Sequence, residues 1–246
     1  MTIKVLSSGS QGNCYVIEDT SNNQLLLECG IKFDEICQHI DFNKVNCCLV
    51  SHSHLDHSKS KDKIIGAFID TYYPGNIQDA KPIFLKNWTI LPIKLTHNVD
   101  CFGYLISNKV ENKTLLFATD TTSLPNIADS EFDCMLIECN YNFDKVIDNG
   151  QNGLLTNDGY KNHMALEELV DWLRFRENKP KNLVAIHLSN NGNIDEELTT
   201  KELSKFTKNF HIAKKGVTIE LWVVYINTNV IIVGASFILI KNVYYV

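Results

Sequence analysis

The sequence has only five prolines in its 246 residues, and it contains no internal repeat, low-complexity tract or collagen-like period. These absences exclude the fibrous, repeat and low-complexity classes of protein. A hydrophobic content of 44% is enough to fill a substantial core in a chain of this length. We therefore expect one globular domain over residues 1–221, followed by a hydrophobic extension over residues 222–246.

The chain also lacks a CxxC pair, although it has eight cysteines. A thiolate zinc site or a thioredoxin-like redox motif is therefore not expected. Most of the cysteines lie inside apolar runs, which is typical of reduced cysteines packed as small hydrophobic residues in a cytoplasmic protein. The first six residues include one lysine and no long apolar stretch, so no secretory signal is expected.

Positive charge and long hydrophobic runs are both scarce. The net charge of −6 argues against a protein that coats nucleic acid, although it is compatible with a local phosphate site. The longest apolar run near the C-terminus, residues 230–240, is about half of the roughly 20 residues that a membrane helix needs. We expect this extension to form a hairpin of strands packed on the same domain, and no contact with a membrane. The alternatives are a tail that binds a partner or a second copy of the chain, and an unnatural tail.

One short stretch, Ser51–His57, has four metal-ligand side chains within six positions. It follows the apolar run Cys47–Val50, so a buried strand is expected to end there and to be followed by a ligand-bearing loop. In an extended segment His52 and His54 point the same way, while Asp56 and His57 lie beyond the turn. A single histidine is usually structural, but this spacing indicates a site for two neighbouring ions. Imidazole and carboxylate ligands suit zinc, with manganese or iron as alternatives.

Ligand-type residues also follow several other predicted strands. His97, Asp120 and His187 each come after an apolar strand-like run, and Glu138 follows the run at 132–137. His163 precedes a helical pattern at residues 164–175. Polar residues at the carboxyl ends of strands are how α/β enzymes build their sites. We expect an α/β fold with four layers, αββα, made of strands at 3–6, 14–18, 25–27, 47–50, 81–85, 88–95, 101–107, 114–118, 132–137 and 182–186 and helices at 32–40, 61–68 and 164–175.

The ordered set HxHxDH, His, Asp and His resembles the signature of the metallo-β-lactamase fold superfamily. It is formed here by His52, His54, Asp56, His57, His97, Asp120 and His187. The resemblance runs from about Ile3 to about Leu221. Four shorter segments look like the YycJ/WalJ-type branch and its phage-encoded relatives, whose members are treated as metal-dependent nucleases or phosphodiesterases. These segments are 8–14, 27–30, 117–121 and 186–189.

The resemblance implies a role for each ligand. His52, His54 and His97 would bind one metal, and Asp56, His57 and His187 the second. Asp120 would bridge the two ions. His163 matches a histidine that contacts the scissile phosphate or protonates the leaving oxygen in nucleases of this fold. Glu28 departs from the pattern, because many superfamily members have Asp there.

Two bridged divalent ions, Zn²⁺ or alternatively Mn²⁺, would lower the pKa of a shared water to about 7, so hydrolysis is the expected chemistry. We expect a nucleic acid or nucleotide substrate, and a bacterial or phage-infected cell as the setting. A thioesterase, a lactam or amide hydrolase, and an inactive binding module remain the alternatives. The candidate catalytic residues are Asp56, Asp120 and His163; the candidate substrate contacts are Lys59, Asn140 and Ser189; and the candidate supports of the ligands are Glu28 and Glu138. Lys59 is followed by Lys61 and Lys63, whose alternative role is a solvated helix face.

Overall fold

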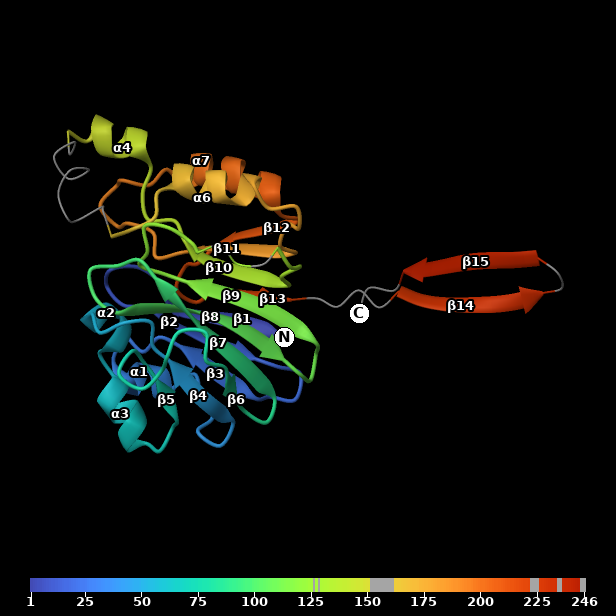
Figure 1. The fold of residues 1–246 in the computed structure, drawn as a ribbon, viewed down its shortest axis with the longest axis horizontal. Helices are drawn as coiled ribbons and strands as arrows, with labels where there is room; N and C mark the ends of the chain where they lie inside the picture. The colour runs from blue at the N-terminus through green and yellow to red at the C-terminus, as the bar shows by residue number, and fades with distance from the viewer. Residues whose placement is uncertain (126, 128, 151–161, 222–225, 234–235, 244–246) are drawn as a thin grey trace.

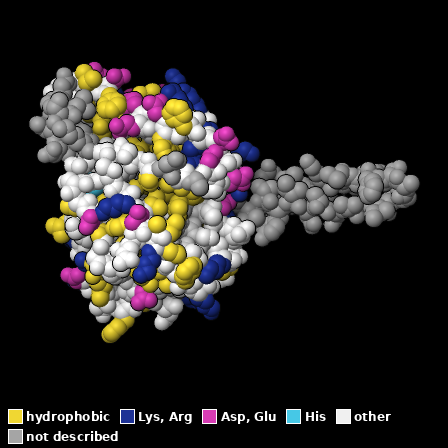
Figure 2. All heavy atoms as spheres, in the orientation of Figure 1, with side chains coloured by type: hydrophobic (Ala, Val, Ile, Leu, Met, Phe, Trp, Pro, Cys, Tyr) yellow, Lys and Arg dark blue, Asp and Glu magenta, His cyan; other side chains and the backbone are white. Residues whose placement is uncertain are grey.

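The computed structural model describes residues 1–125, 127, 129–150, 162–221, 226–233 and 236–243. Two large β-sheets pack face to face, and helices cover the outer face of each (Figure 1). The chain therefore forms the predicted four-layer αββα sandwich. On the face shown in Figure 2, acidic and basic side chains are interspersed, with hydrophobic side chains between them.

The first sheet has six strands in the order β13-β1-β2-β3-β4-β5. The antiparallel meander expected for the opening strands is present, because β1 pairs with β2 and β2 with β3. The strands β3, β4 and β5 are parallel, so β3 and β4 both end at the edge where the histidine motif begins. The strand bounds are β1 Thr2–Ser7, β2 Cys14–Glu18, β3 Gln24–Leu27, β4 Val45–Leu49, β5 Thr71–Tyr72 and β13 Thr218–Glu220.

The second sheet has seven strands in the order β12-β11-β10-β9-β8-β7-β6. Within this sheet, the four strands that come last in the sequence, β9 to β12, are parallel to one another. β7 runs in the same direction, because it and β9 are both antiparallel to β8. Five carboxyl ends therefore meet at one edge. The bounds are β6 Ile83–Phe84, β7 Trp88–Leu95, β8 Cys101–Asn108, β9 Lys113–Ala118, β10 Cys134–Glu138, β11 Asn182–Ile186 and β12 Asn209–Ile212.

Three hydrophobic clusters hold the layers together. The central cluster lies between the sheets, where Tyr15 and Phe117 make an edge-to-face contact with ring centroids 5.9 Å apart. The other two lie between each sheet and its helices. Residues Leu166, Leu169, Val170 and Leu173, whose spacing predicted a helix, are buried against the second sheet.

The helices lie in two groups, one on each outer face (Figure 1). The first group is α1 Phe33–Cys37, α2 Leu55–Ser58 and α3 Lys61–Gly66; the second is α4 Phe143–Asp148, α6 Leu166–Arg174 and α7 Glu196–Leu203, followed by the 3₁₀ turn Ser204–Phe206. The residues after His54 were expected to continue a loop, and this was wrong, because α2 begins at Leu55. The predicted helix at 32–40 is reduced to α1, and the predicted strand at 81–85 to the two residues of β6.

The C-terminal extension contains two strands, β14 Ile226–Val233 and β15 Ser236–Val243. They pair with each other in a separate two-stranded sheet. The packing of this extension on the domain, and the domain boundary near residue 221, stay predictions. Across the residues described above, no helix is long and apolar enough to cross a membrane.

Candidate metal centre

The predicted ligands come together at the edge where the carboxyl ends of the strands meet. His52 lies just beyond β4, His97 beyond β7, Asp120 beyond β9, and His187 directly after β11. Parallel strands bring these positions side by side although the chain separates them by up to 135 residues in numbering, from 52 to 187. All seven predicted ligands lie in this one cluster.

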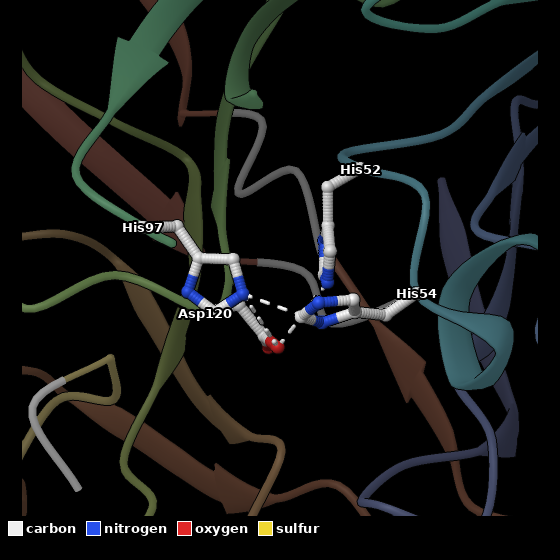
Figure 3. Close-up of side chains that lie close together, drawn as sticks. All are labelled: His52, His54, His97 and Asp120. Carbon is white, nitrogen blue, oxygen red and sulfur yellow. Dashed lines mark hydrogen bonds and ion pairs between the residues drawn. The ribbon is translucent and has the colours of Figure 1, made fainter. Parts of the chain in front are cut away.

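One group of ligand atoms belongs to His52, His54, His97 and Asp120, and these atoms all lie within 4.8 Å of one another. The three imidazoles surround the carboxylate (Figure 3). Asp120 Oδ2 is 3.5 Å from His52 Nε2 and 3.9 Å from His97 Nε2. His54 Nδ1 lies 3.4 Å from His97 Nε2. Three nitrogens and one oxygen therefore converge on one point.

A second group consists of Asp56, His57 and His187. Asp56 Oδ2 is 3.2 Å from His57 Nε2 and 3.4 Å from His187 Nε2. Asp56 and His57 are positioned by the single turn of α2, which places them beside each other and opposite His187. The resemblance grouped the same three residues, and their binding of a metal ion stays a prediction.

Asp120 faces both groups with different oxygen atoms. Its Oδ2 points to His52 and His97, as described above, whereas its Oδ1 is 3.4 Å from both His57 Nε2 and His187 Nδ1. A carboxylate in this arrangement can bridge two cations. A third, overlapping group joins Asp120 and His187 to Glu138 and His163.

Three residues of the centre have left-handed backbone conformations that non-glycine residues rarely adopt. The φ angles are 62° for Glu28, 48° for Asp120 and 52° for His187. Such conformations cost on the order of 1 to 3 kcal/mol each and cluster at functional sites. Glu28 and His187 directly follow a strand and Asp120 lies two residues beyond one, so the unusual φ turns each side chain back into the cluster.

Gly30 allows the turn of α2 that carries Asp56 and His57 to lie directly against the segment that follows β3. A Cβ atom at this position would overlap the carbonyl carbon and oxygen of Asp56. The backbone of this helical turn is held by hydrogen bonds from Asn13 N to Asp56 O (2.7 Å) and from Cys29 N to His57 O (2.8 Å). Glycine is therefore required here for a close approach of two backbone segments.

Several imidazoles are oriented by a contact at the nitrogen that faces away from the cluster. Ser51 Oγ is 2.9 Å from His52 Nδ1, and the carbonyl of Asn162 is 3.1 Å from His97 Nδ1. Glu28, which is fully buried, accepts the backbone N–H of Ser51 (3.2 Å) and lies 3.5 Å from His57 Nδ1. Such partners fix the ring orientation of metal-binding histidines. The role of Glu28 as a support of the ligands stays a prediction, and Ser51 and Asn162 were not predicted.

The residues fit a metal ion, on the evidence of one buried nitrogen. His52 Nε2 is buried, points into the cluster and has no hydrogen-bond partner within the described part of the chain. Burial, together with the charge on His57, lowers the pKa of His52 to about 2, so this imidazole is neutral. A buried polar atom without a partner is costly. A cation would satisfy it, since metal ions bind the neutral form of imidazole.

The second group has more carboxylates around it than the first, because Glu28, Asp120 and Glu138 all lie beside its two imidazoles. Burial opposes protonation of His187, but Asp120, Asp56 and Glu138 outweigh it and raise its pKa to about 10. Likewise, burial lowers the pKa of His57, and the stronger effect of Asp120 and Glu28 raises it well above the ordinary value. Without a metal, protons therefore supply the positive charge that the carboxylates require. The same positions suit divalent cations.

His163 lies beside the centre and is held by Glu138. Its Nδ1 is 2.7 Å from Glu138 Oε1, and its ring stacks on that of His187 at a centroid distance of 5.3 Å. Burial lowers the pKa of His163, but the Glu138 carboxylate outweighs this effect and raises it. His163 remains 22% exposed, so it can reach a substrate. Glu138 is fully buried at the end of β10 and also accepts the backbone N–H of Thr121 (3.0 Å).

Of the three candidate substrate contacts, Asn140 and Ser189 lie beside His187, whereas Lys59 lies after α2. Asn140 Nδ2 donates to the carbonyl of His187 (2.9 Å) and the carbonyl of Asn140 accepts from Ser189 N (2.9 Å), so both residues brace the loop that carries His187. Lys59 follows the last residue of α2, and its contact with substrate stays a prediction. The ammonium groups of Lys61 and Lys63 lie over the rings of Tyr73 and Phe33. This placement favours the alternative for those two lysines, a charged helix face at the surface without contact to substrate.

Comparisons with known proteins agree on the fold. No protein-family model matches the sequence, and no curated protein matches it. Among solved structures, the chain is similar to the metallo-β-lactamase fold protein YhfI from Bacillus subtilis, with a TM-score of 0.68 at 17% identity over 89% of this chain and 98% of that one. It is also similar to zinc-bound PqqB from Methylobacterium extorquens (TM-score 0.65, 12% identity, 89% and 100% covered) and to the short form of human tRNase Z (TM-score 0.60, 11% identity, 91% and 100% covered). Together with the two packed sheets and their outer helices, these likenesses show that the chain has the metallo-β-lactamase fold.

Proposed function

We propose that this protein is a dinuclear metal-dependent phosphodiesterase that acts as a nuclease or on a small nucleotide. The observation that carries this proposal is the position of Asp120 between two ligand groups, with one carboxylate oxygen facing each. The His163–Glu138 pair lies directly beside these groups. Bridged ions next to a proton donor are the arrangement expected for displacement at phosphorus.

The metal ions would be divalent, with zinc the first candidate, because imidazole and carboxylate are its common ligands. His52, His54, His97 and Asp120 would hold one ion, and Asp56, His57, His187 and Asp120 the other. When bound, such ions stabilise negative charge on phosphoryl oxygens and lower the pKa of a coordinated water to about 7. The protein supplies the position of these charges and the orientation of the ligand rings.

The side chains around the ions then have separate tasks. The Glu138 carboxylate stabilises the imidazolium form of His163, whose exposed edge can give a proton to the leaving oxygen. Asp56 is 25% exposed, and its pKa is well below the ordinary value, since the hydrogen bonds and charges of His187 and His57 outweigh the effect of burial. It therefore presents an ionised carboxylate that can help to hold a cation and can accept a hydrogen bond from the attacking water, which orients that water. Asn140 keeps His187 in place through the backbone contact described above.

The proposal extends to the YycJ/WalJ-like branch, because residues of the matching segments support the metal ligands. Ser8 Oγ accepts the backbone N–H of His187 (2.9 Å), and the backbone N–H of Asn13 donates to the carbonyl of Asp56 (2.7 Å). These contacts give a physical reason for the segment 8–14 to accompany this ligand set. A phosphodiester in DNA, RNA or a cyclic nucleotide is the corresponding substrate class.

The test is hydrolysis of bis(p-nitrophenyl) phosphate, single-stranded DNA, RNA and cyclic nucleotides by zinc-loaded protein. We expect turnover of at least one of these substrates, loss of that activity in Asp120→Ala, and unchanged activity in His39→Ala, since His39 is exposed and lies outside the cluster. If the protein binds two metal ions but hydrolyses only thioesters or lactam-like amides, the phosphodiesterase proposal is wrong and an acyl hydrolase replaces it. If Asp120→Ala retains full activity, the assignment of the centre is wrong.

A further inference from the structure

A large cavity lies at the edge of the second sheet opposite the metal centre. Its volume is about 850 Å³, within the range of binding pockets for small molecules and chain segments. It is lined at the amino ends of the parallel strands: Lys181 directly precedes β11, whereas His187 directly follows it. Lys113 begins β9 in the same way, and Asp120 lies beyond the end of that strand.

The charge of this cavity is opposite in sign to that of the whole protein. Five lysines and two carboxylates line it, an excess of three positive charges, although the chain carries a net charge of −6. The lysines are Lys113, Lys179, Lys181, Lys205 and Lys208, and the carboxylates are Glu111 and Asp133. A concave, locally basic surface on an acidic protein concentrates anions.

Two of the five lysines are committed to the fold. Lys113 is buried, and its ammonium group donates to the carbonyl of Leu221. Lys179 donates to carbonyl groups at the end of α6, among them that of Leu173 (2.5 Å). Neither can move to a ligand without loss of these contacts.

The other three, Lys181, Lys205 and Lys208, are exposed to solvent. Lys181 pairs with Asp133 (2.9 Å) and Lys205 with Glu202 (2.6 Å), yet their side chains are 60% and 54% exposed. Exposed ion pairs of this kind contribute little to stability, so these ammonium groups can exchange a carboxylate for a phosphate.

We propose that this basic cavity, defined by Lys181, Lys205 and Lys208, binds the phosphate backbone of a nucleic-acid chain at a distance from the metal centre. The inference rests on the proposed function, because it identifies the substrate as a polymer rather than a single nucleotide. Three lysines that contact phosphates give a salt dependence of about −2 in log K against log [salt] for a single strand.

The two sites are separated by the length of the parallel strands. The five residues of β11 span about 17 Å at 3.3 Å per residue. At 3.4 Å per nucleotide, this corresponds to at least about five nucleotides. Shorter substrates therefore reach the metal centre alone, whereas longer chains contact the cavity as well.

The experiment measures binding and cleavage by zinc-loaded protein. Binding is followed by fluorescence anisotropy with a labelled phosphorothioate single-stranded DNA much longer than five nucleotides, at 50 mM and 200 mM salt, the range over which such binding weakens strongly. The variant carries Lys181→Gln, Lys205→Gln and Lys208→Gln. The matched control carries Lys44→Gln, Lys86→Gln and Lys201→Gln, three exposed lysines that do not line the cavity.

We expect the wild type and the control to lose roughly 20-fold in affinity between the two salt concentrations, and the cavity variant to lose most of this dependence. The cavity variant should also raise KM for long DNA, with unchanged turnover of bis(p-nitrophenyl) phosphate and an unchanged melting temperature. Equal binding by the cavity variant and the control would overturn the inference, as would the absence of DNA binding by the wild type. Failure of the wild type to hydrolyse any of bis(p-nitrophenyl) phosphate, single-stranded DNA, RNA and cyclic nucleotides would instead count against the proposed function.

Discussion

The role of His163 gives the sharpest mutational prediction, because it separates two kinds of substrate. A phosphodiester of an ordinary alcohol needs a proton on its leaving oxygen, whereas p-nitrophenolate leaves as an anion. We expect His163→Ala to lower kcat for a dinucleotide by about 10²- to 10⁴-fold, the usual contribution of a general acid. The same variant should change kcat for a p-nitrophenyl ester of a nucleotide by less than about 10-fold.

The magnitude follows from the contacts of the imidazole. The charge-assisted bond of His163 Nδ1 to Glu138 (2.7 Å) has a typical value of about 1.5 to 3 kcal/mol. Glu138→Gln removes that charge, so it should reproduce part of the effect, by about 10- to 100-fold on the dinucleotide. His39→Ala is the matched control, because this exposed histidine lies outside the cluster. Equal losses on both substrates in His163→Ala would refute the proton-donor role and indicate damage to metal binding instead.

Three further predictions concern the architecture of the centre. Gly30→Ala should lower the free energy of unfolding by about 1 to 3 kcal/mol and weaken zinc binding, because the new Cβ displaces the Asp56 backbone. Gly66→Ala is the control, because there is open space around Gly66. Equal melting temperatures and zinc affinities in the two variants would contradict this reasoning. Zinc binding at pH 7.5 should release protons, because His187 is protonated in the metal-free protein, where its pKa is raised to about 10, and must be neutral as a ligand. A calorimetric binding enthalpy that is the same in buffers of different ionisation enthalpy would argue against this proton release. Glu28→Asp should weaken zinc affinity by about 10- to 100-fold, because the shorter side chain cannot keep its contacts with both Ser51 N and His57. An unchanged dissociation constant for zinc would show that these contacts are dispensable.

The sequence was most informative where local spacing and strand ends coincide. The motif beginning at His52 and the apolar runs before His97, Asp120 and His187 predicted both the layers and the clustering, because parallel strands bring their carboxyl ends together. The amphipathic spacing of α6 was equally readable.

Other features leave no pattern that a sequence can show. The two-residue strands β5 and β6 have too few positions for an alternating pattern, and α2 is a single turn. Asn162 contacts His97 through its backbone carbonyl, which every residue has, so its identity carries no signal. The inward turn of Glu28 and His187 depends on a left-handed φ that tertiary contacts impose.

The most direct test of the central claim is a zinc titration of the metal-free protein, with bound zinc and hydrolysis of bis(p-nitrophenyl) phosphate measured on the same samples. The two ligand groups joined by Asp120 predict activity that rises until two zinc ions are bound per chain and then stays constant. Asp120→Ala should bind less zinc and stay inactive throughout. Full activity at one zinc ion per chain, or activity that does not depend on bound zinc, would contradict the account.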